Sequence, residues 1–337
     1  SDHVFLTDSG LETELIFLDR MDLPCFAAFT LLKTGEGLAR LRDYYQRFAT
    51  TAKLGGYGLV LESPTWRANP EWAAKVGYSN AALAEANRKA IYLMVEIRDR
   101  NETPRSPMVI SGNLGPRGDG YDPGRMMSAN EAQDYHSEQI AVFQNTEADL
   151  VSAFTMNYVN EATGVARAAK AAAMPVVISF TVETDGRLPT GQTLKDAIAE
   201  VDTETGAAPV YYMLNCAHPT HFAEVLDAGE PWVKRLRGMR ANASRRSHAE
   251  LDTATDLDDG DPRRVVSAEW VRLDTPAETN PAKVPQGYSS NQGGGSGGRL
   301  VLIVIDQPNI RFGGTLGIRK AVNGFLDRLQ PSDRTAI

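Results

Sequence analysis

Cysteine is scarce in this chain, which has 337 residues and only two cysteines, Cys25 and Cys216. Two cysteines cannot build the disulfide framework of a small secreted domain, so we expect a reducing, cytoplasmic environment. Long apolar runs are also missing, since no stretch approaches the roughly 20 residues that a membrane-spanning helix needs. The N-terminal text "SDHVFLTDSG" lacks the charged and apolar regions of a secretory signal. These absences predict a cytoplasmic protein without a membrane partner.

Clustered positive charge is absent as well. The formal net charge is −8, whereas proteins that bind nucleic acid neutralise phosphates with grouped lysines and arginines. The one basic stretch, between Lys234 and Arg246, is short and interrupted, which is typical of a solvated surface. We therefore expect small-molecule partners and no nucleic acid.

A glycine-rich phosphate loop is absent too. The first β-like run is followed by "DSGLE" rather than GxGxxG, so a Rossmann fold loses its main sequence signal. Instead, runs rich in Val, Ile and Leu alternate with helical segments, which is typical of a parallel sheet buried on both faces. Strands are predicted at residues 4–8, 58–63, 107–115, 148–156, 174–182, 209–216, 238–244 and 299–306. This α/β pattern favours a single (β/α)8 TIM barrel domain over residues 1–337.

Helix boundaries are visible between the predicted strands. Ser79, Ser128 and Asn160 are predicted N-caps, because their short polar side chains can accept a hydrogen bond from the first helical turn. The Gly55–Gly56 pair is predicted to end the helix that follows the first strand.

The C-terminal quarter departs from this pattern. Residues 262–299 are rich in Pro, Gly, Ser and Asn and end in a Gly/Ser run, so we interpret them as an atypical flexible or inserted segment within the barrel. A final helix is predicted over residues 317–330.

Polar residues stand at the end of each of the first seven predicted strands. In chain order they are Asp8 with Glu12, Glu62, Asn113, Thr155 with Asn157, Glu183, Asn215 with Cys216, and Asn242. The chemistry of a (β/α)8 barrel takes place at the carboxyl ends of its strands. Any one of these residues alone could be an ordinary polar loop residue, but their convergence from seven strands indicates a site.

The stretch "MLNCAHPTHF" at residues 213–222 places Cys216 two residues before His218 and five before His221. Three interpretations are open: a compact metal site, a nucleophile with its base, or a buried strand-end cysteine followed by loop residues. The spacing is a weak zinc signature, since Pro219 bends the chain between the histidines and His221 is expected to enter a helix. A catalytic cysteine–histidine pair is weaker still, because sequence cannot bring ring nitrogen and sulfur together.

Seven blocks, in order, resemble the homocysteine S-methyltransferase family. They are "TDSGLETELIF" (7–17), "DLPCFAAFTLL" (22–32), "LESPTWRAN" (61–69), "NLGPRGD" (113–119), "SFTVETDGRLPTGQTL" (179–194), "LNCAHPTHF" (214–222) and "RANASRRSHAELD" (240–252). The resemblance implies a (β/α)8 barrel that methylates the sulfur of homocysteine to give methionine. It leaves the methyl donor open among S-methylmethionine, S-adenosylmethionine and betaine.

The same resemblance implies a zinc ion held by three cysteines. One lies in an "NC" block, matched here by Asn215 and Cys216, and two lie in a "GGCCG" block. The nearest text to that block, "RFGGTLGIR", carries Thr315 and Leu316 where the cysteine pair belongs. Because one cysteine cannot form such a tetrahedral site, His218 and His221 are the candidate substitutes. Zinc would deprotonate the substrate thiol and hold its sulfur for attack on a methyl group.

The resemblance also points to the amino-acid end of the substrate. Asp8 and Glu183 match positions where the family places carboxylates, the natural partners of an ammonium group. Glu12 could instead pair with an arginine or cap the first helix. The expected substrate-binding residues are Asp8, Gly10, Glu12, Glu62, Glu183 and Asn215. The alternative function is a non-catalytic or repurposed family member that binds a small amino acid without zinc. A barrel left open at its eighth strand would expose sheet edges and favour a homo-oligomer.

Overall fold

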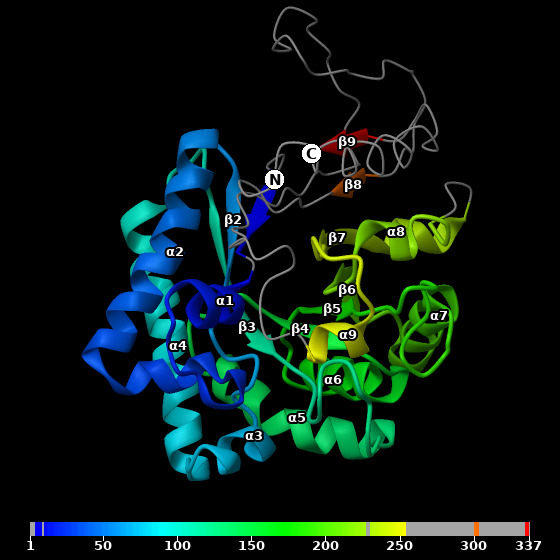
Figure 1. Ribbon diagram of the computed structural model, residues 1–337, viewed down its shortest axis with the longest axis horizontal. Coiled ribbons are helices and arrows are strands. Elements are labelled where there is room, and N and C mark those ends of the chain that lie inside the picture. Colours follow the sequence, from blue (N-terminus) through cyan, green and yellow to red (C-terminus); the bar gives the residue numbers. More distant parts are fainter. Residues whose placement is uncertain (1–3, 9, 227–229, 254–299, 303–333, 337) are drawn as a thin grey trace, which may run out of the picture.

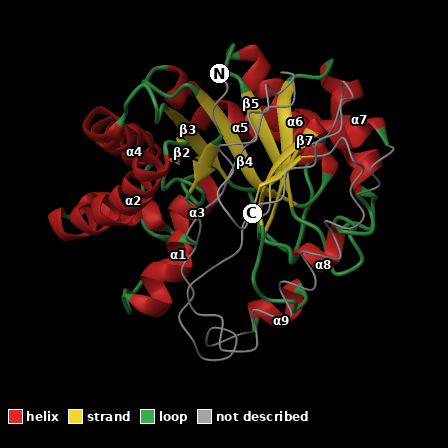
Figure 2. Ribbon diagram, turned by 90° about the horizontal axis from the view of Figure 1, so that it is seen from above, coloured by secondary structure: helices red, strands yellow, loops and turns green. Residues whose placement is uncertain are grey.

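The main sheet contains seven parallel strands in the computed structural model, which describes residues 4–8, 10–226, 230–253, 300–302 and 334–336. The strands are β1 (Phe5–Thr7), β2 (Gly58–Glu62), β3 (Met108–Leu114), β4 (Leu150–Met156), β5 (Val176–Phe180), β6 (Pro209–Asn215) and β7 (Leu236–Arg240). Each strand pairs with the next one along the chain. The sheet curls into a half-barrel (Figure 1 and Figure 2).

Helices alternate with the strands and lie around the outside of the curled sheet (Figure 2). They are α1 (Leu11–Thr13), α2 (Gly35–Gly55), α3 (Pro70–Lys75), α4 (Asn80–Asn101), α5 (Ala129–Gln144), α6 (Val159–Ala171), α7 (Leu194–Thr205), α8 (Pro219–Phe222) and α9 (His248–Asp252). A π-helical turn (Glu14–Leu18) continues α1, and 3₁₀ turns cover Pro24–Phe26, Ala28–Lys33 and Pro231–Arg235. Among the described helices, none has the length and apolar composition needed to cross a bilayer.

Most of the predicted helix boundaries are confirmed. The Ser79 side chain accepts from Ala82 N at the start of α4, and Ser128 forms a capping box with Glu131 at the start of α5. Gly56 ends α2 in the left-handed conformation, with φ of 71°. The predicted cap at Asn160 is wrong, because α6 begins at Val159 and its N-cap is Tyr158. The chain turns into this helix directly after β4, which places Asn160 within the first turn.

The last two predicted strands differ from expectation. β7 spans Leu236–Arg240, whereas residues 238–244 were expected, so the strand ends at Arg240 and Asn242 lies beyond it. β8 (Leu300–Leu302) lies within the expected eighth strand but pairs with β9 (Arg334–Ala336) in a separate two-stranded sheet. The predicted segment 262–299 and the helix predicted over 317–330 lie outside the described residues.

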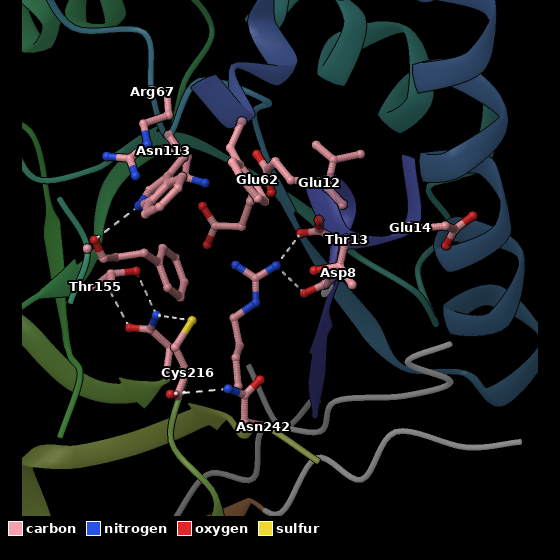
Figure 3. A pocket seen from close by; sticks show the side chains of 18 of the residues that line it. Asp8, Glu12, Thr13, Glu14, Glu62, Arg67, Asn113, Thr155, Cys216 and Asn242 are labelled. Atoms are coloured by element: carbon pink, nitrogen blue, oxygen red, sulfur yellow. Dashed lines mark hydrogen bonds and ion pairs between the residues drawn. The ribbon is translucent and has the colours of Figure 1, made fainter. Parts of the chain in front are cut away.

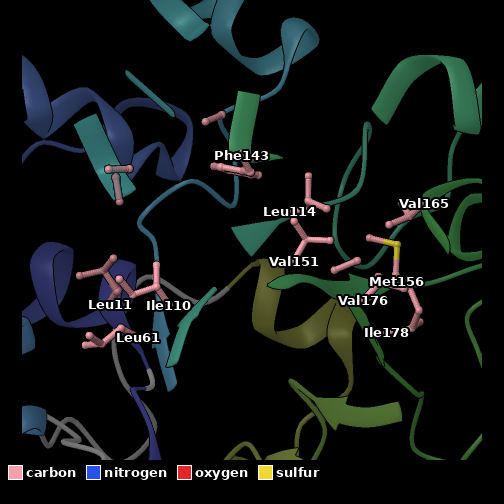
Figure 4. Packing of buried hydrophobic residues seen from close by; sticks show 14 of the residues in the cluster. Leu11, Leu61, Ile110, Leu114, Phe143, Val151, Met156, Val165, Val176 and Ile178 are labelled. Carbon is pink, nitrogen blue, oxygen red and sulfur yellow. The ribbon is translucent and has the colours of Figure 1, made fainter. Parts of the chain in front are cut away.

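A hydrophobic core lies between the sheet and its helices (Figure 4). Ile110 of β3, Val151 of β4 and Phe143 of α5 are each fully buried in it. β2 and β5 are buried at every position, as expected for parallel strands covered on both faces. Burying a side chain of this kind stabilises the fold by about 1.5–3 kcal/mol. The packed sheet is thus a firm support for the polar residues at its carboxyl ends.

Candidate active site

A pocket of about 450 Å³ opens at the carboxyl ends of the strands (Figure 3). Its volume lies within the range of about 300–1,000 Å³ that small-molecule sites occupy. The polar and charged residues lining it include Asp8, Glu12, Glu62, Arg67, Asn113, Asp119, Thr155, Asn215, Cys216, Arg240 and Asn242. Residues from distant parts of the sequence therefore meet where barrel chemistry takes place.

The structure brings together most of the residues that the sequence singled out, although their roles stay predictions. Those lining the pocket are Asp8, Gly10, Glu12, Glu62, Asn113, Thr155, Asn215, Cys216 and Asn242, while those outside its lining are Asn157, Glu183, His218 and His221.

Asp8 is already engaged by a cation. Arg240, the last residue of β7, donates from Nη2 to Asp8 Oδ1 at 3.0 Å and to the Asp8 carbonyl oxygen. Asp8 Oδ2 accepts from the Tyr44 hydroxyl at 3.1 Å. Burial raises the pKa of Asp8, and the Arg240 charge opposes that shift. The Arg240 guanidinium also lies 4.6 Å from the centroid of the Phe154 ring.

Sequence reasoning missed Arg240 as a site residue. It lies in a predicted strand, and the strand end was placed at Ser244, so the polar residue assigned to that end was Asn242. Placing the strand end four residues earlier would have identified Arg240, since the text "GMR" ends there.

Two further carboxylates, Glu12 and Glu62, are not used in ion pairs among the described residues. Burial raises the pKa of Glu62 to about 7, with the Arg240 charge opposing, and Glu62 Oε2 has no hydrogen-bond partner in the part of the chain that the structure describes. Burial likewise raises the pKa of Glu12 to about 7, and the like charge of Asp8 contributes to the same shift. Gly10, not Glu12, is the N-cap of α1. Both glutamates are therefore poised to exchange protons near neutral pH.

Asn215 organises the opposite wall of the pocket. Its Oδ1 accepts from Thr155 N at 3.0 Å and from Ser179 Oγ at 2.7 Å. Its Nδ2 donates to Thr155 Oγ1 at 2.9 Å and to Cys216 Sγ at 3.2 Å. Thr155 and Cys216 have left-handed φ values of 60° and 55°, which are strained for residues with a Cβ and which cluster at functional sites. Burial raises the pKa of Cys216, so its thiol is protonated at neutral pH.

The two histidines of the "CAHPTH" text serve local structure. His218 caps α8, where its Nδ1 accepts from Thr220 N at 3.2 Å. His221 lies within α8, as expected, and its Nε2 is 3.0 Å from the Arg245 carbonyl oxygen. Among the described residues, no group of three His, Cys, Asp or Glu side chains is placed to hold a metal ion.

The donor set does not fit the three-cysteine zinc site that the family resemblance implies. Of the two cysteines of the chain, Cys216 lines the pocket, whereas Cys25 is not among the described residues that line it. Polar neighbours of Cys216 Sγ include the Asn215 amide N–H, which donates a hydrogen bond and cannot ligate a metal, and the hydroxyl-bearing side chains of Tyr121 and Thr155. Thr315 and Leu316 lie outside the described residues, but neither side chain supplies a thiolate.

Glu183 reaches the pocket wall indirectly. His248 Nδ1 lies 2.9 Å from Glu183 Oε1, and His248 Nε2 lies 3.1 Å from both Thr181 Oγ1 and the Cys216 carbonyl oxygen. The His248 ring also stacks on Tyr121, a pocket residue, with centroids 4.1 Å apart. Sequence reasoning missed His248. The signal available was its place in the last resembling block, "RANASRRSHAELD".

The rim of the pocket includes Trp66, whose ring lies 4.1 Å from the Arg67 guanidinium. Arg67 also stacks on Trp72 at 3.8 Å and donates to the Gly118 carbonyl oxygen at 2.8 Å. Arg67 therefore stacks on two indole rings of the segment after β2 and joins that segment to the loop after β3 through its hydrogen bond.

We expect Gly115→Ala to destabilise the protein by about 1–3 kcal/mol, as overpacking typically does. A Cβ atom at Gly115 would overlap the backbone carbonyl oxygen of Trp66 and lie 2.6 Å from Cδ1 of its ring, so the loop that carries Trp66 would have to move. Gly35→Ala is the matched control, because no atom of the described residues lies within 4 Å of its Cβ position. Chemical unfolding of both variants measures the difference. Equal stability of Gly115→Ala and wild type would show that the rim adapts freely.

Comparison with known sequences decides the family. The profile described as homocysteine S-methyltransferase matches residues 5–273, most of the chain. The chain belongs to the homocysteine S-methyltransferase family. None of the curated proteins matches it.

Solved structures of a homocysteine methyltransferase, MmuM from Escherichia coli, share the fold. The metallated form is 17% identical with a TM-score of 0.56, covering 73% of this chain and 93% of that one. The oxidized form is 18% identical with a TM-score of 0.59, covering 74% of this chain and 85% of that one. The predicted TIM-barrel class is thereby confirmed, and the described residues supply seven parallel strands of it.

Proposed function

We propose that this protein transfers a methyl group from a small-molecule donor to the thiol of homocysteine, giving methionine. The observation that carries the proposal is the pocket at the strand ends, which Cys216 and several acidic side chains line within a chain of this family. Its size suits an amino acid and a compact donor.

The reaction needs a base. A free thiol has a pKa of about 8.5, so at neutral pH little of it is the nucleophilic thiolate. Glu12 lines the pocket and makes no ion pair with a described residue, and burial raises its pKa to about 7. In the proposed step the Glu12 carboxylate takes the thiol proton, sulfur attacks the methyl carbon, and the donor's bond to that carbon breaks. The electron pair of the broken bond leaves with the donor, whose positive charge is thereby neutralised.

The pocket favours such a step electrostatically. A thiolate and a cationic sulfonium or quaternary ammonium donor become two neutral products, and this loss of charge is more favourable in a low-dielectric site than in water. The buried polar groups that line the pocket, such as Asn215 and Thr155, are fixed by hydrogen bonds and need little reorganisation.

The test is a donor screen. Purified protein is incubated with homocysteine and, separately, S-methylmethionine, S-adenosylmethionine or betaine carrying a deuterated methyl group, and labelled methionine is measured by mass spectrometry. We expect catalytic turnover with one of these donors. Absence of labelled methionine with all three would refute the proposal.

Zinc content is a separate prediction. Because the residues around Cys216 do not form the three-cysteine site, we expect purified protein to hold far less than one zinc per chain. Plasma mass spectrometry should give the same low value for wild type and Cys216→Ala. Near-stoichiometric zinc that disappears in Cys216→Ala would mean that Cys216 recruits other ligands, with His218 and His221 the first to test.

A second function is favoured by the same donor set. A family member with one of three zinc cysteines could keep an amino-acid pocket and use it for binding alone. Calorimetric binding of methionine, together with no methyl transfer in the donor screen, would select this alternative.

A further inference from the structure

Arg240 places a positive charge inside the pocket. Its side chain is 13% exposed, and its hydrogen bonds to described residues all run from Nη2 to Asp8. A guanidinium is a planar fork of five donors, so Nε and Nη1 remain for another acceptor. Both Asp8 carboxylate oxygens are occupied, by Arg240 and by the Tyr44 hydroxyl. Asp8 is therefore poorly placed to receive the ammonium group of a substrate.

Glu62 offers the opposite charge. The residue is 3% exposed, its Oε2 has no hydrogen-bond partner among the described residues, and its side chain projects into the pocket (Figure 3). A buried carboxylate oxygen without a partner is costly unless a ligand completes its hydrogen bonding. Glu62 and Arg240 line the same pocket, yet no ion pair joins these two described side chains.

We propose that Arg240 and Glu62 hold the two charged ends of an amino-acid substrate, Arg240 binding the α-carboxylate and Glu62 the α-ammonium. The inference rests on the proposed function for its substrate class and replaces the expected role of Asp8. A guanidinium edge matches a carboxylate with two parallel hydrogen bonds, and an ammonium donates readily to an unpaired carboxylate oxygen. Asp8 then orients Arg240, holding Nη2 while the other donors face the ligand.

The test is calorimetric binding of three unreactive ligands: methionine, 3-(methylthio)propylamine, which lacks the carboxylate, and 4-(methylthio)butanoate, which lacks the ammonium. We expect Arg240→Gln to weaken the binding of methionine and of the butanoate by about 10- to 100-fold. The affinity for the amine should stay within about threefold of wild type. Glu62→Gln should weaken the binding of methionine and of the amine and leave the affinity for the butanoate unchanged. Arg237→Gln, on the same strand but outside the pocket lining, is the matched control.

Removing Arg240 alone leaves the buried charge of Asp8 without a counterion, which could destabilise the fold. The double variant Asp8→Asn/Arg240→Gln removes both charges and is measured beside it. The same ligand selectivity in the double variant supports the inference. Equal weakening of all three ligands, or no weakening of any, would overturn it, as would a wild type that fails to bind methionine.

The outcomes separate this inference from the proposed function. Selective binding as described, without methyl transfer in the donor screen, would support the roles of Arg240 and Glu62 in substrate binding and refute the proposed enzyme activity. Methyl transfer with no ligand selectivity in the Arg240 variants would support the enzyme activity and refute these binding roles.

Discussion

Glu12→Gln should lower kcat for methyl transfer by about 10²- to 10⁴-fold, the range typical of a lost general base. Glutamine keeps the shape of the side chain but cannot take the thiol proton. In the wild type, burial raises the pKa of Glu12 to about 7. The carboxylate form is the active one, so kcat should rise as pH increases through about 7 and then level off. In the variant, kcat should not show this rise with pH.

Two comparisons make that result specific. Glu36→Gln alters an exposed glutamate in the first turn of α2 and should leave kcat unchanged. Glu62 has a pKa of about 7 as well, but an ammonium bound to it keeps it ionised in the complex, so its loss should affect KM more than kcat. Wild-type kcat and an unchanged pH limb in Glu12→Gln would show that another group takes the proton.

The second large effect is on stability. Glu62→Gln should be more stable than wild type by about 3 kcal/mol at pH 8 and by less than about 1 kcal/mol at pH 5. Glu62 is 3% exposed, and burial raises its pKa from 4.5 to about 7. Between these values the folded protein keeps a proton that the unfolded chain has lost. Wild-type stability therefore falls as pH rises through this window, and the neutral amide removes that loss.

Urea unfolding at pH 5 and pH 8 measures this effect, with Glu36→Gln as the exposed control. A loss of stability between the two pH values that is the same in wild type and Glu62→Gln would show that Glu62 ionises without cost. The cost matters for function, because a carboxylate destabilised in the empty pocket gains the most from a bound ammonium.

The sequence was most informative where one physical pattern acts alone. Continuous apolar runs predicted β1 to β6 within a few residues, because parallel strands covered on both faces have no polar side. Ser79 and Ser128 were recognisable as caps, since an N-cap depends on adjacent residues only. Asn160 was misplaced because the turn after β4, rather than local cap preference, sets where α6 begins.

The candidate site was only partly predictable. Strand ends identified Glu62, Asn215 and Cys216 as neighbours, because parallel strands bring their carboxyl ends together. Arg240 was not predicted as a site residue, because its role depends on an ion pair with Asp8, which is 232 positions away in the chain. No local pattern predicts that Asp8 enters the pocket already paired, or that His248 links Glu183 to the Cys216 carbonyl.

We propose that the pocket methylates homocysteine with its own acidic residues and without a three-cysteine zinc site. The most direct measurement is methionine formation, with the donor found in the screen, by protein treated with a chelator and verified as zinc-free by plasma mass spectrometry. We predict the same kcat before and after zinc removal, and a loss in Glu12→Gln. Activity that disappears with the metal and returns when zinc is added to wild type, but not to Cys216→Ala, would contradict this zinc-independent reaction.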